Sequence, residues 1–118
     1  MKVNSLYLSV YDMTRAVDFY ERKIFGKPAS SLTERFSYFD IAGFLFCLFN
    51  PAIGDEAHIK GNNCIPTIQV ERIEEYLNEL KSKNVVISMD LRQVGAYHLF
   101  QCKDSESNIL EFYEIKES

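Results

Sequence analysis

The sequence predicts an α+β fold built from two tandem β-α-β-β-β modules within one domain, residues 1–118. Three observations lead to this prediction. A strand-like segment at 5–12 followed by a helical pattern at 14–25 is echoed by the segments 65–71 and 72–83. Strand-like runs follow each helical pattern, and each half ends in an aromatic-rich run. With one helix covering one face of each sheet, the free faces of a curled mixed sheet are expected to line a cleft.

Module one, about residues 1–50, opens with a half-buried strand, because Leu6, Leu8 and Val10 alternate with other residues at period two. Asp12 or Thr14 can cap the helix that follows. The helix presents a single apolar stripe, which Gly26 and Pro28 terminate; the stripe contains Met13, Ala16, Val17, Tyr20 and Ile24.

A hairpin completes this module, with strands at Phe36–Ile41 and Phe44–Asn50 around Ala42-Gly43. Residues 51–63 contain proline, glycine and paired asparagines without any periodicity, so they are expected to be the linker between the modules. His58 falls in this linker and is expected to be a solvated loop residue, with a lid role as the alternative.

Module two, residues 64–118, repeats the plan with a strand at Ile65–Val70 and a helix over Arg72–Lys83. One face of this helix is apolar, and Asn84 is expected to stop it; the face consists of Ile73, Tyr76, Leu77 and Leu80. The three strands predicted to follow are Val85–Met89, Tyr97–Cys102 and Ile109–Ile115.

Composition excludes several classes of function. The net charge is −4 and the basic residues are scattered, which argues against nucleic-acid binding. No apolar run approaches the roughly 20 residues of a membrane span, and no secretory leader is recognisable. The three cysteines form no CxxC pair and are odd in number, so we expect a reducing, cytoplasmic location without disulfides or structural zinc.

Alternation along the strands places a set of aromatic and mildly polar side chains on the expected cleft face. Such a lining suits a small organic ligand with a flat or apolar body. The alternative is that these side chains simply fill the space between the modules or form a dimer interface. The residues are Tyr7, Ser9, Phe49, Thr67, Gln69, Leu99, Gln101 and Tyr113.

Two stretches resemble a known family. The opening stretch Leu6–Met13, continued by Phe19-Tyr20 and Phe25-Gly26, resembles the start of vicinal oxygen chelate proteins. This superfamily includes glyoxalase I, extradiol dioxygenases, and the fosfomycin and bleomycin resistance proteins. The closing stretch resembles the family ending, because Asp104, Asn108 and Glu111 keep its spacing while serines replace its proline and glycine. The resemblance covers nearly the whole chain and implies the glyoxalase/bleomycin resistance/dioxygenase fold.

The resemblance also implies where a metal would bind. The four ligand positions of metal-dependent members correspond here to Ser5, Cys47, Ile65 and Glu111. A catalytic divalent ion typically needs three protein donors and an open position. Of these four residues, only Glu111 and the thiolate form of Cys47 are suitable metal donors. If an ion binds to this pair, zinc is the one that suits it best. We therefore expect no cofactor.

Three further residues have alternative interpretations. Glu111 has two interpretations. It is either a general base, with a pKa raised by an apolar cavity, or a remnant carboxylate that pairs with a tyrosine or water. Cys47 is expected to be a buried apolar group rather than a nucleophile, and it joins the ligand-lining set. His98 is expected to point toward the helix side of its sheet, as a structural residue.

The function expected from these observations is metal-independent binding or sequestration of a small molecule. The resemblance implies a homodimer. One alternative is a metal-dependent glyoxalase-like lyase or isomerase that uses Glu111 with Cys47. Another is an accessory module whose cleft is closed by tyrosines and phenylalanines.

Overall fold

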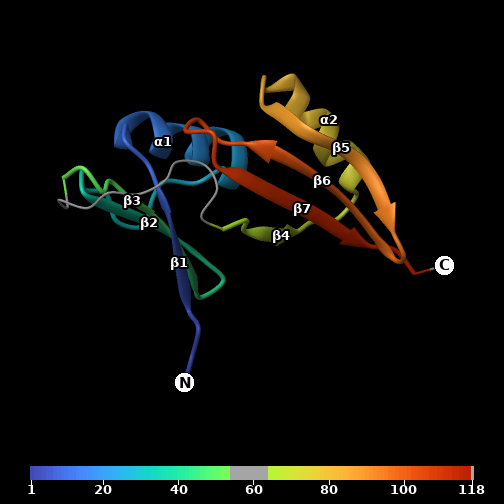
Figure 1. The fold of residues 1–118 in the computed structure, drawn as a ribbon, viewed down its shortest axis with the longest axis horizontal. Coiled ribbons are helices and arrows are strands. Elements are labelled where there is room, and N and C mark those ends of the chain that lie inside the picture. The colour runs from blue at the N-terminus through green and yellow to red at the C-terminus, as the bar shows by residue number, and fades with distance from the viewer. Residues whose placement is uncertain (54–63, 118) are drawn as a thin grey trace. The chain divides into compact units, whose positions relative to one another are not determined.

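The computed structural model describes residues 1–53 and 64–117, which form parts of two compact units, residues 1–63 and 64–118 (Figure 1). Each unit contains one mixed sheet and one main helix. This confirms the predicted α+β class and its two-part organisation. The division falls at the end of the predicted linker, most of which, His58 included, lies outside the described residues.

Unit 1 is a three-stranded mixed sheet with its helix on one face. The sheet order is β1-β3-β2, in which β1 and β3 are parallel and β2 and β3 antiparallel. The predicted β-α-β-β-β plan calls for one strand more than the three in this unit; outside these strands, the described residues form an isolated bridge between Ser31 and Tyr38. The elements are β1 (Ser5–Ser9), α1 (Met13–Phe19), the π-helix η1 (Tyr20–Phe25), β2 (Phe36–Ile41) and β3 (Phe44–Phe49).

Asp12 is the residue that caps α1, because its carboxylate accepts a hydrogen bond from the backbone N–H of Arg15 at 3.0 Å. The predicted helix over 14–25 is helical throughout, but its second half widens into η1 and ends at Gly26, whose φ is +67°. In an α-helix, residues five apart lie about 140° away from each other around the axis. The wider turn instead brings Tyr20 and Phe25 into a stacked contact at 5.8 Å.

The core of unit 1 is aromatic. Tyr20, fully buried, contacts Phe46 on β3 and Phe39 on β2, with ring centroids at 5.1 and 6.3 Å. Phe25 contacts the same two rings at 5.2 and 5.0 Å. These contacts assign the even-numbered residues of β3 to the helix-covered face. The odd-numbered residues, Cys47 among them, therefore lie on the other face.

Unit 2 is a four-stranded mixed sheet in the order β4-β7-β6-β5, with α2 on one face (Figure 1). Strand β4 pairs with β7 in parallel, and the other two pairings are antiparallel. Tyr76 of α2 contacts Phe112 on β7 at 4.9 Å, and Phe112 stacks on Phe100 at 5.4 Å. The elements are β4 (Thr67–Gln69), α2 (Ile73–Ser82), β5 (Val86–Val94), β6 (Tyr97–Lys103) and β7 (Ile109–Ile115).

The element boundaries agree with the sequence in most places. The hairpin turns at Ala42-Gly43, where both residues have positive φ as in a type I′ turn. The predicted end of β5 at Met89 is wrong, because pairing with β6 continues to Val94 through two register shifts. Ile87, Met89 and Leu91 alternate with polar residues, which was an available signal as far as Leu91, whereas residues 92–94 are exposed and break the pattern. No helix within the described residues is long and apolar enough to cross a membrane.

Candidate functional site

The lining residues predicted in module one all lie on the helix-free face of unit 1. Strand pairing sets Tyr7 beside Cys47 and Ser9 beside Phe49. Cys47 and Ser9 are buried, whereas Tyr7 is 51% exposed. The rings of Tyr7 and Phe49 meet edge to face, with centroids 5.5 Å apart. This face therefore offers an aromatic surface that is partly exposed.

A cavity of about 290 Å³ opens on this face. The described residues that line it are Tyr7, Arg35, Phe36 and Phe49. Phe36 on β2 pairs directly with Phe49, and their ring centroids lie 6.4 Å apart. The volume lies at the lower end of the range for small-molecule sites, roughly 300 to 1,000 Å³. A cavity of this size suits a small, flat molecule.

Sequence reasoning missed Arg35 and Phe36. Phe36 was placed at the start of a strand but not assigned to a face, and Arg35 lies just before that strand. The backbone carbonyl of Arg35 accepts a hydrogen bond from the N–H of Asn50, which ties the residue to the end of β3. The parity of Phe36 with Tyr38 and Asp40 was an available signal for the aromatic residue. Nothing in the sequence pattern singles out the arginine.

In unit 2, the predicted lining residues also fall on the helix-free face. Thr67, Glu111 and Gln101 form one row across β4, β7 and β6. The Gln101 amide Nε2 donates a hydrogen bond to the Glu111 carboxylate Oε1 at 3.0 Å. Among the described residues, the hydrogen-bond partner of Glu111 is therefore the side-chain amide of Gln101 and not a tyrosine.

A second row on the same face joins Gln69, Tyr113 and Leu99. Tyr113 contacts Tyr97, with centroids 5.8 Å apart. Gln69 and Thr67 are exposed, and the other members of both rows are half-buried. The structure therefore places all the predicted lining residues on the two helix-free faces, each within its own unit.

His98 lies on the opposite, helix-covered side, as predicted. It pairs across the sheet with Glu114, whose carboxylate reaches the first turn of α2. Together with the parity of Phe100, this places the imidazole on the α2 side of β6.

The four positions that would hold a metal in the related family do not fit one here. Ile65 carries no donor atom, and Ser5 offers only a hydroxyl. Burial raises the pKa of the Cys47 thiol, which disfavours the thiolate that a metal would need. The Cys47 thiol instead lies 3.5 Å from the carbonyl of Leu45 as a donor. Within residues 1–53 and 64–117, no three His, Cys, Asp or Glu side chains gather as a metal group.

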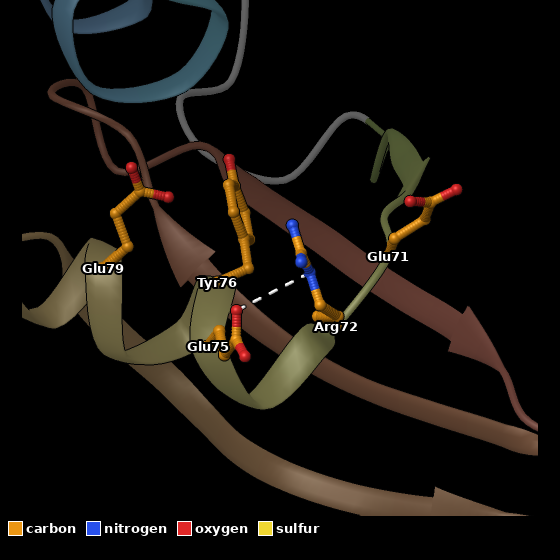
Figure 2. Close-up of a pocket in the computed structure, with 5 residues that line it drawn as sticks. All are labelled: Glu71, Arg72, Glu75, Tyr76 and Glu79. Atoms are coloured by element: carbon orange, nitrogen blue, oxygen red, sulfur yellow. Dashed lines mark ion pairs between the residues drawn. The ribbon is translucent and has the colours of Figure 1, made fainter.

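A different cavity, of about 330 Å³, lies at the start of α2 (Figure 2). The described residues that line it are Glu71, Arg72, Glu75, Tyr76 and Glu79. The guanidinium of Arg72 forms an exposed ion pair with Glu75 at 3.6 Å. Three carboxylates surround one guanidinium, so the lining is acidic. The spacing of four between successive glutamates was the sequence signal for this shared side.

Tyr76 is the aromatic member of this acidic cavity, which we call the α2 cavity. Its ring is held by Phe112 and Phe100, and Figure 2 shows the side chain projecting from the same side of the helix as Glu79. Burial raises the pKa of Tyr76, and Cys102 and Glu79 raise it further. The phenol therefore remains protonated at neutral pH.

No protein-family model and no curated protein matches the sequence, whereas many solved structures match the fold. The chain is similar to a glyoxalase/bleomycin resistance protein/dioxygenase from Nocardioides, with a TM-score of 0.82 and 15% identity over 100% of this chain and 85% of that one. It is similar to a protein from Bacillus anthracis assigned to the glyoxalase family, with a TM-score of 0.80 and 17% identity over 98% and 96% of the two chains.

A third similar structure is a lactoylglutathione lyase from Agrobacterium tumefaciens, with a TM-score of 0.78 and 14% identity over 96% of this chain and 92% of that one. The fold is therefore the one shared by these glyoxalase, bleomycin resistance protein and dioxygenase structures. This confirms the fold that the sequence resemblance implied. At these identities the likeness establishes the fold and leaves the activity to the site itself.

Proposed function

We propose that this protein binds a small organic molecule without a metal, and that it sequesters or carries the molecule rather than converting it. The observation that carries the proposal is the cavity on the helix-free face of unit 1, where three aromatic side chains surround a space of about 290 Å³. Concave, mostly apolar sites with a few polar groups are the usual form of small-molecule sites. Ligand binding would draw chiefly on burial of apolar surface against Tyr7, Phe36 and Phe49.

The helix-free face of unit 2 supports the same proposal. Glu111 and Gln101 form a hydrogen-bonded pair with spare donor and acceptor capacity, flanked by Thr67 and Tyr113. Such a pair can recognise an amide or a hydroxyl of a ligand. The carboxylate would also attract a cationic group.

The competing hypothesis is a metal-dependent lyase or isomerase, in line with the name of the Agrobacterium tumefaciens structure. That chemistry needs convergent donors, and the residues at the four positions supply a single carboxylate and a thiol held in its protonated form. The donor set is therefore what favours binding over catalysis.

The test is a thermal-shift screen of the whole protein against a library of neutral, anionic and cationic small molecules. We expect at least one class to raise the melting temperature in proportion to ligand concentration. A screen in which every class leaves the melting temperature unchanged contradicts the proposal.

Elemental analysis of protein purified without chelator separates binding from metal catalysis. We expect less than one-tenth of an equivalent of zinc, nickel or manganese in both the unmodified protein and Glu111→Gln. Glu117→Gln, an exposed carboxylate near the end of the chain, is the matched control. Stoichiometric metal that disappears only in Glu111→Gln would overturn the metal-independent proposal.

Two further parts of the proposal concern assembly and location. We propose a homodimer, which light scattering behind a sizing column should report as twice the mass of one chain. We also propose a cytoplasmic location, with which the three free cysteines agree because reducing compartments keep thiols unpaired.

A further inference from the structure

The described lining of the unit 1 cavity combines aromatic residues with one basic residue. Arg35 lines the cavity together with Tyr7, Phe36 and Phe49. Tyr7 and Phe36 are 51% and 37% exposed, which is unusual for rings of this size. The three rings contact one another through Phe49, with centroids 5.5 and 6.4 Å apart. They form one continuous aromatic wall.

The guanidinium of Arg35 has no ion-pair partner among the residues that the structure describes. Other exposed arginines, such as Arg22 and Arg72, are paired with carboxylates. A guanidinium presents several N–H donors in a planar fork that matches a carboxylate in two parallel hydrogen bonds. No carboxylate appears in the described lining of this cavity. The described part of the lining therefore carries one positive charge, which attracts an anion.

From these two features the geometry points to a planar aromatic carboxylate as the ligand class of this cavity. The ring of the ligand would lie against Tyr7 and Phe36, and its carboxylate would accept hydrogen bonds from Arg35. This inference rests on the proposed function and narrows it to one chemical class. It also separates the unit 1 cavity from the acidic α2 cavity, whose lining repels the same ligand.

The test uses three probes that share one ring system and differ in charge: 2-naphthoate, 2-naphthamide and 2-naphthylmethylammonium. Binding to the whole protein is measured by isothermal titration calorimetry at low salt. A charge-assisted hydrogen bond to a partly exposed guanidinium is worth roughly a five- to tenfold change in affinity. We expect 2-naphthoate to bind about five- to tenfold more tightly than the amide, and the ammonium to bind most weakly.

Three variants locate the effect. Arg35→Gln should remove the preference for 2-naphthoate over 2-naphthamide, and Arg35→Lys should retain part of it because the charge remains. Arg22→Gln is the matched control, since it removes an exposed guanidinium from the same unit on the helix-covered side. It should leave all three affinities unchanged. Tyr7→Leu should weaken the naphthoate and the amide alike, because it removes ring contact without touching charge.

The outcomes separate this inference from the broader proposal. Equal binding of the three probes, or a naphthoate preference that survives in Arg35→Gln, overturns the aromatic-carboxylate inference and leaves small-molecule binding in place. The same holds if none of the probes binds while library compounds of another class do. If neither the probes nor any library compound binds, both the inference and the proposed function fail.

Discussion

The carboxylate of Glu114, at the end of β7, accepts a hydrogen bond from the backbone N–H of Ile73, the first residue of α2, at 3.1 Å. Its other oxygen accepts one from the N–H of Arg72 at 3.2 Å. Arg72 occupies the N-cap position, makes no side-chain cap and has a left-handed φ of +52°. Glu114, which is forty-one positions away from Ile73, therefore caps the N-terminus of α2, a role usually filled by a serine or aspartate next to the helix.

Replacing Glu114 should destabilise the start of α2 and lower the free energy of unfolding. Glu114→Ala leaves two N–H groups of the first turn without their acceptor and removes a negative charge from the positive end of the helix dipole. We expect a loss of about 1 to 2 kcal/mol in the free energy of unfolding, measured in urea. Glu117→Ala, which removes an exposed carboxylate nearby, should change it by less than about 0.5 kcal/mol. Equal stabilities of the two variants would contradict the capping role.

The buried thiol of Cys102 should make the protein less stable in alkali. Burial raises the pKa of Cys102 from its ordinary value of 9.0 to about 12, and the charge of Asp104 adds to the rise. Between these two pH values the unfolded chain releases the thiol proton while the folded protein keeps it. The folded state then binds more protons, so its stability falls as the pH rises, by at most about 1.4 kcal/mol per pH unit.

The measurement is the free energy of unfolding from pH 8 to 11.5 in the unmodified protein, in Cys102→Ala and in Cys64→Ala. Cys102→Ala is expected to be less stable at pH 8 because it leaves a cavity, but to have a shallower decline above pH 9. Cys64 is exposed, so its replacement should leave the slope as it was. Identical slopes in all three proteins would show that Cys102 does not titrate on unfolding.

The turn between β6 and β7 should become more stable with a glycine at Ser107. Ser107 has a φ of +67°, a left-handed conformation that costs a residue with a Cβ about 1 to 2 kcal/mol. The turn retains it because the Asp104 carboxylate accepts hydrogen bonds from the N–H groups of Glu106 and Asn108, both at 2.8 Å. We expect Ser107→Gly to raise the free energy of unfolding by about 1 kcal/mol.

Ser107→Ala is the control for this change, since it removes the hydroxyl but keeps the strained backbone. It should be no more stable than the unmodified protein. A gain in Ser107→Ala as large as that in Ser107→Gly would assign the effect to the hydroxyl rather than to the backbone.

The three cysteines should differ in reactivity in the order of their exposure. Cys64 is exposed, whereas Cys47 and Cys102 are buried and burial raises the pKa of both thiols. At pH 8 iodoacetamide should modify Cys64 at least tenfold faster than the other two, as measured by peptide mass spectrometry over time. Modification of Cys47 as fast as that of Cys64 would point to a thiolate in the unit 1 face and revive its candidacy as a nucleophile.

Much of the fold could be read from periodicity. Leu8 and Val10 alternate in a strand, and Ile73, Leu77 and Leu80 recur at helical spacing, so burial of an apolar face determined the element type. The end of β5 was missed because Arg92, Gln93 and Val94 are exposed and break the apolar alternation, although they pair with β6 at the edge of the sheet. The π-helix was missed because the apolar stripe of this segment fits an ordinary α-helix, while the wider turn is seen in the contact of Tyr20 with Phe25.

The candidate site also has parts that the sequence predicts and parts that it does not. The parity of Tyr7, Phe49, Glu111 and Tyr113 along their strands was enough to place each on a helix-free face, because successive side chains of a strand alternate. The same reading showed that Ile65 and Ser5 cannot replace metal donors, since that depends on residue chemistry alone. The tertiary structure decided which residues contact one another. It pairs Gln101 with Glu111 and Glu114 with the start of α2, and it places Arg35 in the lining of the aromatic cavity. Such partnerships join residues far apart in sequence, and a local pattern carries no record of the strand register or loop path that brings them together.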